Sequence, residues 1–481
     1  MTILRILILI LLTSGILFSA QKKDSLINSI VRVTVQYQSV NYYYPWVYRA
    51  PQSRSGQGII IDKNLVLTQA YLVKQARFIE CRFGSEPTPL ILKPVYVDID
   101  RNIALLSGNL PDSAKKIKIH SNAQLEHADL VNFFWKTDTG RFLEGNAKFD
   151  RADSYVYNPS FQSQLWYEFN QPSATGGYGE PVFKGDDFVG ISVYGSDSSL
   201  TVLSAKVIQK SLKLYYNKNA KTNMMGFKTT PCTQKYLRLK NNLKQSDGGC
   251  YVIDTFGQGC GSKTLLKGDL LLKINETPLD AWGRYQHPIY GKINFSHLFS
   301  NFKLSDSIEA TVIRGGEKTI LNFNSGIIED EKWVIPRYRH GQQSRYFIRG
   351  GFIFQNLSLP YLKAWGNEWA KKAPENILRV LEENRYKLKT QEKQEILILS
   401  HILAHPLNRG LQYIGRQIIH SVNGKELSGL DELYKLLEKD SDSISLELMP
   451  GKTPLLLSPN KLKLIDPEIK RLYNIDKLKN L

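Results

Sequence analysis

Alternating apolar and polar positions predict that the chain consists mainly of short β-strands. Ser29–Tyr37 alternates in this way and is rich in β-branched residues, as expected of a half-buried strand. Ser55–Thr68 predicts two strands around a turn at Asp62–Asn64. Leu200–Tyr215 predicts a strand and a closing helix, and the polar stretch Tyr216–Asn223 is typical of a linker. Residues 21–215 therefore predict a β-rich domain of their own.

The rest of the chain predicts two smaller units that share a strand-turn-strand pattern. In the first unit, a Gly-Asp turn at Asp269 leads into a buried strand, and a turn at Asn275 leads into the next strand. In the second unit, Ile418–Leu427 repeats this pattern and is followed by a predicted helix and a predicted strand. That helix covers Leu430–Lys439 and that strand covers Ile444–Met449, and two helical insertions are expected at Leu359–Leu381 and Gln391–His405.

The N-terminus has the three parts of a secretory signal peptide. Met1–Arg5 is short and basic, Ile6–Phe18 is almost wholly apolar, and Ser19-Ala20 precede a polar stretch. The apolar run is too short to span a bilayer comfortably. We expect cleavage after Ala20 and export, to a periplasm or alternatively to the cell surface. Because Phe18 fits poorly three residues before the cut, an uncleaved membrane anchor is the other reading.

Composition describes an ordinary globular protein. The 481 residues are 42% apolar and 22% charged, which excludes a disordered or fibrous chain and suits about three domains. The net charge of +18 favours anionic partners in general, yet lysine-rich solubility explains it as well. Without a compact basic run or a nucleic-acid motif, we expect no nucleic-acid partner.

The four cysteines are Cys81, Cys232, Cys250 and Cys260. The last three fall in one predicted domain, so an oxidising compartment allows one disulfide bridge and one free thiol. A metal site needs closer pairing with histidine or more cysteines. We therefore expect no metal and no cofactor.

Three segments carry the candidate chemistry. The sequence S-G-Q-G-I-I-I-D-K-N-L-V-L-T-Q-A-Y-L-V at 55–73 resembles the histidine-bearing segment of the HtrA/Deg serine proteases, with Tyr71 in the place of the histidine. The sequence D-I-D-R-N-I-A-L-L at 98–106 resembles the family's D-x-x-x-D-I-A-L-L pattern, with Asn102 in the place of the aspartate. The sequence G-G-Y-G-E-P at 176–181 resembles G-N-S-G-G-P, with Tyr178 in the place of the serine. The order of the three positions is that of the chymotrypsin-like fold.

The replacements remove each part of the catalytic apparatus. A serine protease needs a hydroxyl nucleophile, an imidazole base and a carboxylate that stabilises the imidazolium. A tyrosine phenol, with an ordinary pKa of about 10, accepts protons poorly at neutral pH. Asn102 lacks the negative charge, and the ring of Tyr178 occupies substrate space. The sequence therefore predicts lost proteolysis and a former active site closed by Tyr178.

Nearby polar residues offer no evident replacement for the triad. Ser173 and Thr175 lie too far before the nucleophile position, and His120 and His127 lie away from the histidine position. The oxyanion hole uses backbone N–H groups instead. The glycines of this loop could keep its shape, and they are Gly176, Gly177 and Gly179.

Two segments resemble the carboxylate-binding loops of PDZ domains. Met225-Gly226-Phe227 matches the φ-G-φ pattern of such a loop, and Gly351-Phe352-Ile353 is its more diverged counterpart. In PDZ domains a peptide adds as an extra strand beside the loop, whose N–H groups capture the terminal carboxylate. The resemblance covers about residues 29–450 and is closest to the plant-type Deg branch, which implies that the second module is occupied internally and helps to hold trimers or hexamers together.

The resemblance implies a mainly β fold with some helix. We expect a chymotrypsin-like double β-barrel followed by two PDZ-like domains, the second with helical insertions. The expected boundaries are 1–20 for the signal peptide, 21–215 for the trypsin-like domain, 216–223 for a linker, 224–325 for the first PDZ-like domain, 326–345 for a linker, 346–460 for the second PDZ-like domain and 461–481 for a C-terminal tail.

The functional expectation is a secreted Deg-type pseudo-protease. It would bind unfolded polypeptides or C-terminal segments as a chaperone or adaptor, or act as a regulatory scaffold for an active Deg relative. The alternative is an active Deg-like serine endopeptidase of envelope protein quality control with a non-standard site. Fold alone does not decide between these functions.

Overall fold

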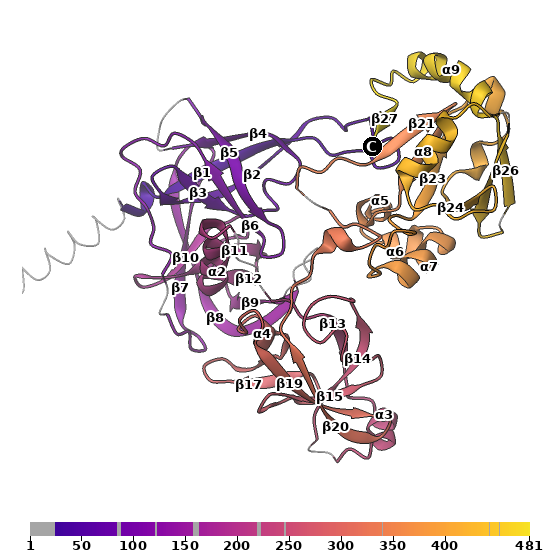
Figure 1. Ribbon diagram of the computed structural model, residues 1–481. Helices are drawn as coiled ribbons and strands as arrows, with labels where there is room; N and C mark the ends of the chain where they lie inside the picture. The colour runs from indigo at the N-terminus through magenta and orange to yellow at the C-terminus, as the bar shows by residue number, and fades with distance from the viewer. Residues whose placement is uncertain are drawn as a thin grey trace, which may run out of the picture. The chain divides into compact units, whose positions relative to one another are not determined.

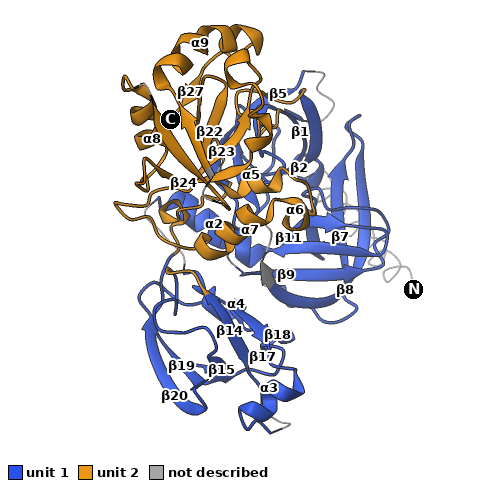
Figure 2. Ribbon diagram, turned by 90° about the vertical axis from the view of Figure 1, so that its right-hand side faces the viewer, with its two compact units in different colours: residues 1–37, 51–254, 259–327 blue, residues 38–50, 255–258, 328–481 orange. Residues whose placement is uncertain are grey.

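The computed structural model describes residues 25–83, 88–120, 123–156, 163–218, 223–244, 247–338, 340–441, 443–451 and 453–481. Its contacts divide the chain into two compact units (Figures 1 and 2). Unit 1 holds residues 1–37, 51–254 and 259–327, and unit 2 holds residues 38–50, 255–258 and 328–481. The predicted signal peptide lies outside the described residues. No helix in the described ranges has both the length and the apolar character needed to cross a membrane.

Two closed six-stranded antiparallel barrels form most of unit 1, which confirms the expected double-barrel fold. The strand order is β1-β2-β3-β6-β5-β4 in the first barrel and β10-β11-β12-β9-β8-β7 in the second. The first barrel contains β1 (Ile30–Tyr37), β2 (Gln52–Asp62), β3 (Leu65–Thr68), β4 (Ala76–Arg82), β5 (Leu90–Asp98) and β6 (Ile103–Ser107). The second contains β7 (Leu130–Lys136), β8 (Phe142–Val156), β9 (Ser163–Asn170), β10 (Pro181–Lys184), β11 (Asp187–Gly195) and β12 (Ser199–Ser204), and α2 (Ala205–Tyr216) follows.

The first PDZ-like segment also belongs to unit 1. Its sheet has the order β13-β14-β15-β19-β20, with β16 paired to β15, and a separate hairpin joins β17 to β18. One hydrophobic core continues from Phe149 and Tyr167 of the second barrel to Phe295 and Phe299 of this segment. The elements are β13 (Phe227–Pro231), α3 (Lys235–Lys240), β14 (Cys250–Thr255), β15 (Leu270–Ile274), β16 (Thr277–Pro278), β17 (Arg284–His287), β18 (Gly291–Asn294), α4 (Ser296–Phe299), β19 (Ser307–Arg314) and β20 (Glu317–Asn324).

Unit 2 is a seven-stranded antiparallel sheet of order β26-β25-β24-β23-β22-β21-β27 with helices packed on it. Its elements are η1 (Asp330–Lys332), β21 (Tyr346–Arg349), β22 (Phe352–Asn356), α5 (Leu359–Lys363), α6 (Trp369–Lys372), α7 (Glu375–Asn384), β23 (Leu397–Ile402), η2 (Pro406–Asn408), η3 (Gln412–Ile414), β24 (Gln417–Val422), α8 (Leu430–Glu438), β25 (Ile444–Met449), β26 (Thr453–Leu457), α9 (Pro459–Leu472) and β27 (Lys479–Asn480).

The structure corrects the helical insertion expected at Gln391–His405. This segment contains strand β23 instead. Leu397 and Leu399 pack into one core cluster with α8, whereas Ile396 and Ile398 pack into another with α5 and α7. Because the strand is buried on both faces, its continuous apolar run carries no period of two and cannot be told from a helix by pattern alone.

Two further expectations changed. All four cysteines are buried free thiols, so the disulfide bridge that the sequence allowed is not formed. Residues 461–481, expected as a tail, supply most of α9 and all of β27, which pairs with β21. The sheet of unit 2 therefore extends beyond the expected domain boundary at residue 460.

Candidate functional site

Tyr71 and Asn102 lie together, as the resemblance implied. The Asn102 side-chain oxygen Oδ1 accepts a hydrogen bond from the Tyr71 backbone N–H at 2.9 Å, and Asn102 adopts a positive φ of 55°. Asparagine tolerates this conformation better than most residues. The Tyr71 side chain is 57% exposed, with the Arg54 guanidinium 5.3 Å from its ring centroid. The two predicted triad positions are therefore adjacent, and neither side chain is an imidazole or a carboxylate.

Tyr178 does not fill the loop that carries it. Its side chain is 56% exposed and so lies at the surface and not inside the loop, and the closing of the site by this ring stays a prediction. Its backbone is nevertheless firmly held, because the Tyr178 carbonyl accepts a hydrogen bond from the Gln57 N–H at 2.7 Å.

Glu180 is the residue that fills the loop. Its side chain is buried, and Oε2 accepts hydrogen bonds from the N–H groups of Gly177 and Tyr178, both at 2.9 Å. The Ser192 hydroxyl donates to the same oxygen. Burial raises the pKa of Glu180 above its ordinary value, and these hydrogen bonds oppose that shift. The backbone donors that an oxyanion hole would supply at Tyr178 are therefore already bonded to an internal carboxyl group.

The loop also lies directly against the end of strand β11. A Cβ atom added at Gly177 would meet the Gly195 nitrogen at 2.5 Å, and one added at Gly195 would meet the Gly176 oxygen at 2.4 Å. Gly177 and Gly179 adopt positive φ angles of 104° and 98°, which favour glycine. This close backbone packing leaves no room for a side chain between the loop and β11.

Gln69 connects the segment that contains Tyr71 to this loop through hydrogen bonds. Its Nε2 donates to the Gly177 carbonyl at 3.1 Å and to the Ser192 carbonyl at 2.8 Å. The structure thus brings together all three predicted triad positions and the predicted glycine loop.

Asp98 takes a structural role near Asn102. Its carboxylate accepts hydrogen bonds from Arg101 and from the Ser211 hydroxyl, each at 2.8 Å. Burial alone would raise the pKa of Asp98, but the Arg101 guanidinium and the hydrogen bonds hold it below the ordinary value. Asp98 therefore links β5 to α2 as a charged, fully engaged carboxylate.

The predicted carboxylate loop of the first PDZ-like segment is partly occupied by its own chain. The Gly226 N–H donates to the Cys260 carbonyl at 2.9 Å, and the Cys260 N–H donates to the Met224 carbonyl at 2.8 Å. Phe227 is buried between Phe295 and Phe299. Strand β13, which begins at Phe227, stands at the edge of the sheet among the described strands.

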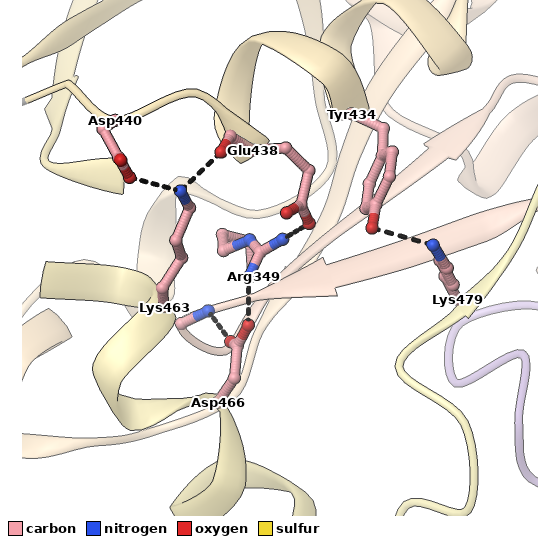
Figure 3. A network of polar contacts seen from close by, with 8 residues as sticks. Arg349, Tyr434, Glu438, Asp440, Lys463, Asp466 and Lys479 are labelled. Carbon is pink, nitrogen blue, oxygen red and sulfur yellow. Dashed lines mark hydrogen bonds and ion pairs between the residues drawn. The ribbon is translucent and has the colours of Figure 1, made fainter. Parts of the chain in front are cut away.

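The predicted loop of the second PDZ-like domain is filled more completely. Phe352 and Ile353 lie in β22, which pairs with β21 on one side and with β23 on the other. Ahead of them, the Gly350 N–H donates to the Asp466 carboxylate at 2.7 Å, and Arg349 donates to the same carboxylate at 2.5 Å (Figure 3). Burial raises the pKa of Asp466, an effect that these two bonds counter. An internal carboxylate thus occupies this glycine turn.

The C-terminal residues cover the outer edge of β21. Tyr346 and Phe347 pair with Asn480 and Lys479 of β27, and the Ile348 N–H donates to the Leu478 carbonyl at 2.8 Å. Lys479 donates to the Tyr434 hydroxyl at 2.8 Å, as Figure 3 shows. Both edges that a peptide could use in this sheet region are therefore already paired.

The sequence contained a signal for Glu180 that was missed. In G-G-Y-G-E-P, a carboxyl group stands where the resembling pattern has a glycine, inside a loop that must be buried. Asp466 lies more than a hundred residues from the turn it contacts, and no local pattern pointed to it. Among the described residues, no cluster of three or more His, Cys, Asp or Glu side chains could hold a metal ion.

Comparisons with known proteins agree with this architecture. A PDZ domain family model matches residues 335–479. The chain is 23% identical over 436 residues to Protease Do-like 2, chloroplastic, of Arabidopsis thaliana, covering 87% of this chain and 69% of that one. It is 20% identical over 445 residues to Protease Do-like 4, mitochondrial, of the same plant, covering 90% and 81%.

A solved structure of a variant of the HtrA-type protease AlgW with a decapeptide is also similar. Its TM-score is 0.51 at 12% identity, and the match covers 64% of this chain and 97% of that chain. At this identity the similarity concerns the fold.

Proposed function

The chain belongs to the HtrA/Deg family, and from this premise we propose that it is a pseudo-protease that binds extended polypeptides without cleaving them. The observation that carries the proposal is the state of the nucleophile loop. Tyr71, Asn102 and Tyr178 replace the triad, and Glu180 bonds the N–H groups of Gly177 and Tyr178. The site therefore lacks the nucleophilic apparatus, and the two N–H groups bonded to Glu180 are not free to bind an oxyanion.

Polypeptide binding is proposed at the first PDZ-like segment. Strand β13 has an open edge among the described strands, and an extended peptide can add there as a further strand. The relative AlgW, a variant of which carries a decapeptide, supports this class of ligand. The predicted site of the second domain is unsuitable because β22, which contains Phe352 and Ile353, already pairs with β21 and β23. We propose an activity as a chaperone, as an adaptor or as a scaffold for an active Deg relative.

Export, location and assembly are part of the same proposal. The signal-like N-terminus supports secretion, to a periplasm or to a cell surface. The family supports a homo-oligomer, and a trimer or hexamer would give several peptide sites and so higher avidity.

A labelled-casein assay with matched revertants tests the proposal. The wild-type chain is expected to leave casein intact. A triple revertant, Tyr71→His with Asn102→Asp and Tyr178→Ser, is expected to remain almost inactive, because Glu180 still holds the loop donors. Adding Glu180→Gly is expected to raise the rate of the triple revertant at least about a hundredfold, the usual cost of one missing oxyanion donor.

One outcome would decide against this function, and another would decide against the role of Glu180. Casein cleavage by the wild type that Tyr178→Phe abolishes would establish an active endopeptidase with a non-standard site. Full activity of the triple revertant would show that Glu180 does not block the loop. Suppression of client aggregation by the wild type, without cleavage, would support the chaperone form over the scaffold form.

A further inference from the structure

The connection between β1 and β2 folds as part of unit 2 (Figure 2). This connection, residues 38–50, is called the arm. Its base is fixed in the first barrel, where Tyr37 pairs with Gln52. The arm itself is a compact loop, in which the Asn41 N–H donates to the Val47 carbonyl at 3.0 Å. The Asn41 side chain accepts from the Tyr43 N–H at 3.0 Å, so the tip has a defined shape.

The first anchor of the arm is formed by Tyr42 and Tyr43. The Tyr42 carbonyl accepts a hydrogen bond from Gln355 Nε2 at 3.1 Å. The Tyr43 ring packs edge-on against Tyr361 and Trp365, with centroid separations of 5.4 and 5.0 Å. These are favourable geometries for aromatic pairs. Tyr42 and Tyr43 thereby extend the core cluster around Tyr361.

The second anchor is formed by Tyr44, Pro45 and Trp46. The Tyr44 hydroxyl hydrogen-bonds to His401 Nε2 at 2.8 Å, and their rings lie 5.0 Å apart. Trp46 lies 6.1 Å from Tyr346, and Pro45 between the two aromatic side chains is buried. Tyr44 and Trp46 pack on a different cluster, which includes Tyr346.

The surface that the arm contacts matches these side chains chemically, and we call it the receptor surface. It is formed by Tyr346, Gln355, Tyr361, Trp365 and His401. It offers aromatic faces to Tyr43 and Trp46, a ring nitrogen to the Tyr44 hydroxyl, and an amide to the Tyr42 carbonyl. Arg416 lies 5.8 Å from the Tyr43 ring centroid and adds a cation–π contact. Four of the five residues 42–46 thus contact this surface, two through hydrogen bonds and two through aromatic rings, each with its own partner.

We propose that unit 2 carries a binding site for extended segments in which adjacent tyrosines precede a proline and a tryptophan. The arm fills this site in cis. The site is separate from the glycine turn at Gly350 and from the strand edge covered by β27. It does not depend on the loss of proteolysis. A partner that presents such a segment competes with the arm for the same surface.

The test empties the site and offers the segment in trans. In the full chain, Tyr43→Ala, Tyr44→Ala and Trp46→Ala are combined, and a fluorescein-labelled peptide spanning Asn41–Tyr48 is titrated by anisotropy. The peptide is expected to bind this variant at least tenfold more tightly than the wild type, because the tethered arm has a local concentration of about millimolar. Adding Trp365→Ala to the emptied variant should remove the binding. The exposed arm residue Val47 provides the control Val47→Ala, which should behave as the wild type.

Equal binding by the emptied variant and the wild type, with both chains folded by near-ultraviolet circular dichroism, would overturn the proposal. Should the emptied variant unfold, hydrogen exchange decides in a chain with its arm intact. There His401→Ala removes the hydrogen bond and the ring contact that His401 makes with Tyr44. It is expected to accelerate exchange of the arm amides at least tenfold relative to those of β1. Unchanged arm exchange would contradict a specific site.

Discussion

Single buried polar side chains occupy key positions in this molecule. Glu180 accepts hydrogen bonds from two loop N–H groups, and Asp466 accepts one from the Gly350 N–H. In each case a loop that suits an external anion is bonded to an internal carboxyl group. Lys136 is the opposite case, because its ammonium group is buried and has no hydrogen-bond partner among the described residues. An unpaired buried charge is costly.

Lys136 should therefore be replaceable at a gain in stability. Its side chain is buried with Nζ 5.4 Å from the Phe83 ring centroid, and burial lowers its pKa to about 8. The unfolded chain, with an ordinary pKa of about 10.4, binds more protons between these values, so the free energy of unfolding should rise from pH 8 to about pH 10. Lys136→Met should add about 1–3 kcal/mol at pH 7 and remove this rise.

Urea unfolding at pH 7 and pH 10 measures both effects. The exposed Lys116 provides the control, since Lys116→Met should leave the stability and its pH dependence nearly unchanged. A loss of stability in Lys136→Met would show that the ammonium group has a favourable partner.

At the scale of helices and strands, the sequence predicted those elements whose local pattern of apolar and polar residues is distinct. The alternating strands β1 and β25 and the helix α8 were expected and are present. β23 was mistaken for a helix because both of its faces are buried, which erases the alternation. The positions Tyr71, Asn102 and Tyr178 were found by motif, whereas Asp466 required the packing of α9 against a turn more than a hundred residues earlier.

The Gly350-Gly351 turn between β21 and β22 is packed so closely that it leaves little room for a side chain. Gly351 has a φ of 86°, and a Cβ added there would meet the Leu403 oxygen at 2.6 Å. Gly366 has a similar φ of 94°, but an added Cβ would meet nothing within 4 Å. Gly366→Ala should cost only about 1 kcal/mol of backbone strain. Gly351→Ala should cost about 2 kcal/mol more, because the backbone neighbours must also move.

Thermal unfolding of the two variants separates conformational strain from overpacking. Since both positions lie in unit 2, the difference between their midpoints reports the steric contribution at Gly351. Equal midpoints would mean that the turn accommodates a methyl group, and that its glycine is required only for φ.

At the scale of the whole molecule, the first PDZ-like segment is continuous with the second barrel rather than a separate module. The Tyr167 and Tyr290 hydroxyls lie 3.0 Å apart, and the Asn294 N–H donates to Asp153 at 3.0 Å. The Ser296 hydroxyl donates to Ser163 at 2.7 Å. A shared core and these polar contacts predict that the barrels and this segment unfold together.

His297 makes the stability of the contact between the second barrel and the first PDZ-like segment depend on pH. His297 lies on α4, which packs against β8 and β9. Its Nδ1 forms a hydrogen bond of 2.8 Å with the Tyr285 hydroxyl. Burial, together with the smaller effects of the positive charges of His287, Lys210 and Lys206, lowers the pKa of His297 to about 3. With an unfolded pKa of about 6.5, the unfolded chain binds the extra proton between pH 6.5 and 3, so stability falls as the pH drops through this range.

The expected loss between pH 7.5 and pH 5 from this one group is about 2 kcal/mol. His297→Gln, which keeps a neutral acceptor for the Tyr285 hydroxyl, should lose about 2 kcal/mol less over the same interval in urea titrations. His120→Gln, at an exposed position, is the matched control and should retain the full loss. Identical pH dependence in the wild type and His297→Gln would mean that another group governs the acid response. If the prediction holds, the barrels and the first PDZ-like segment should weaken in one transition, because the histidine lies within their common core.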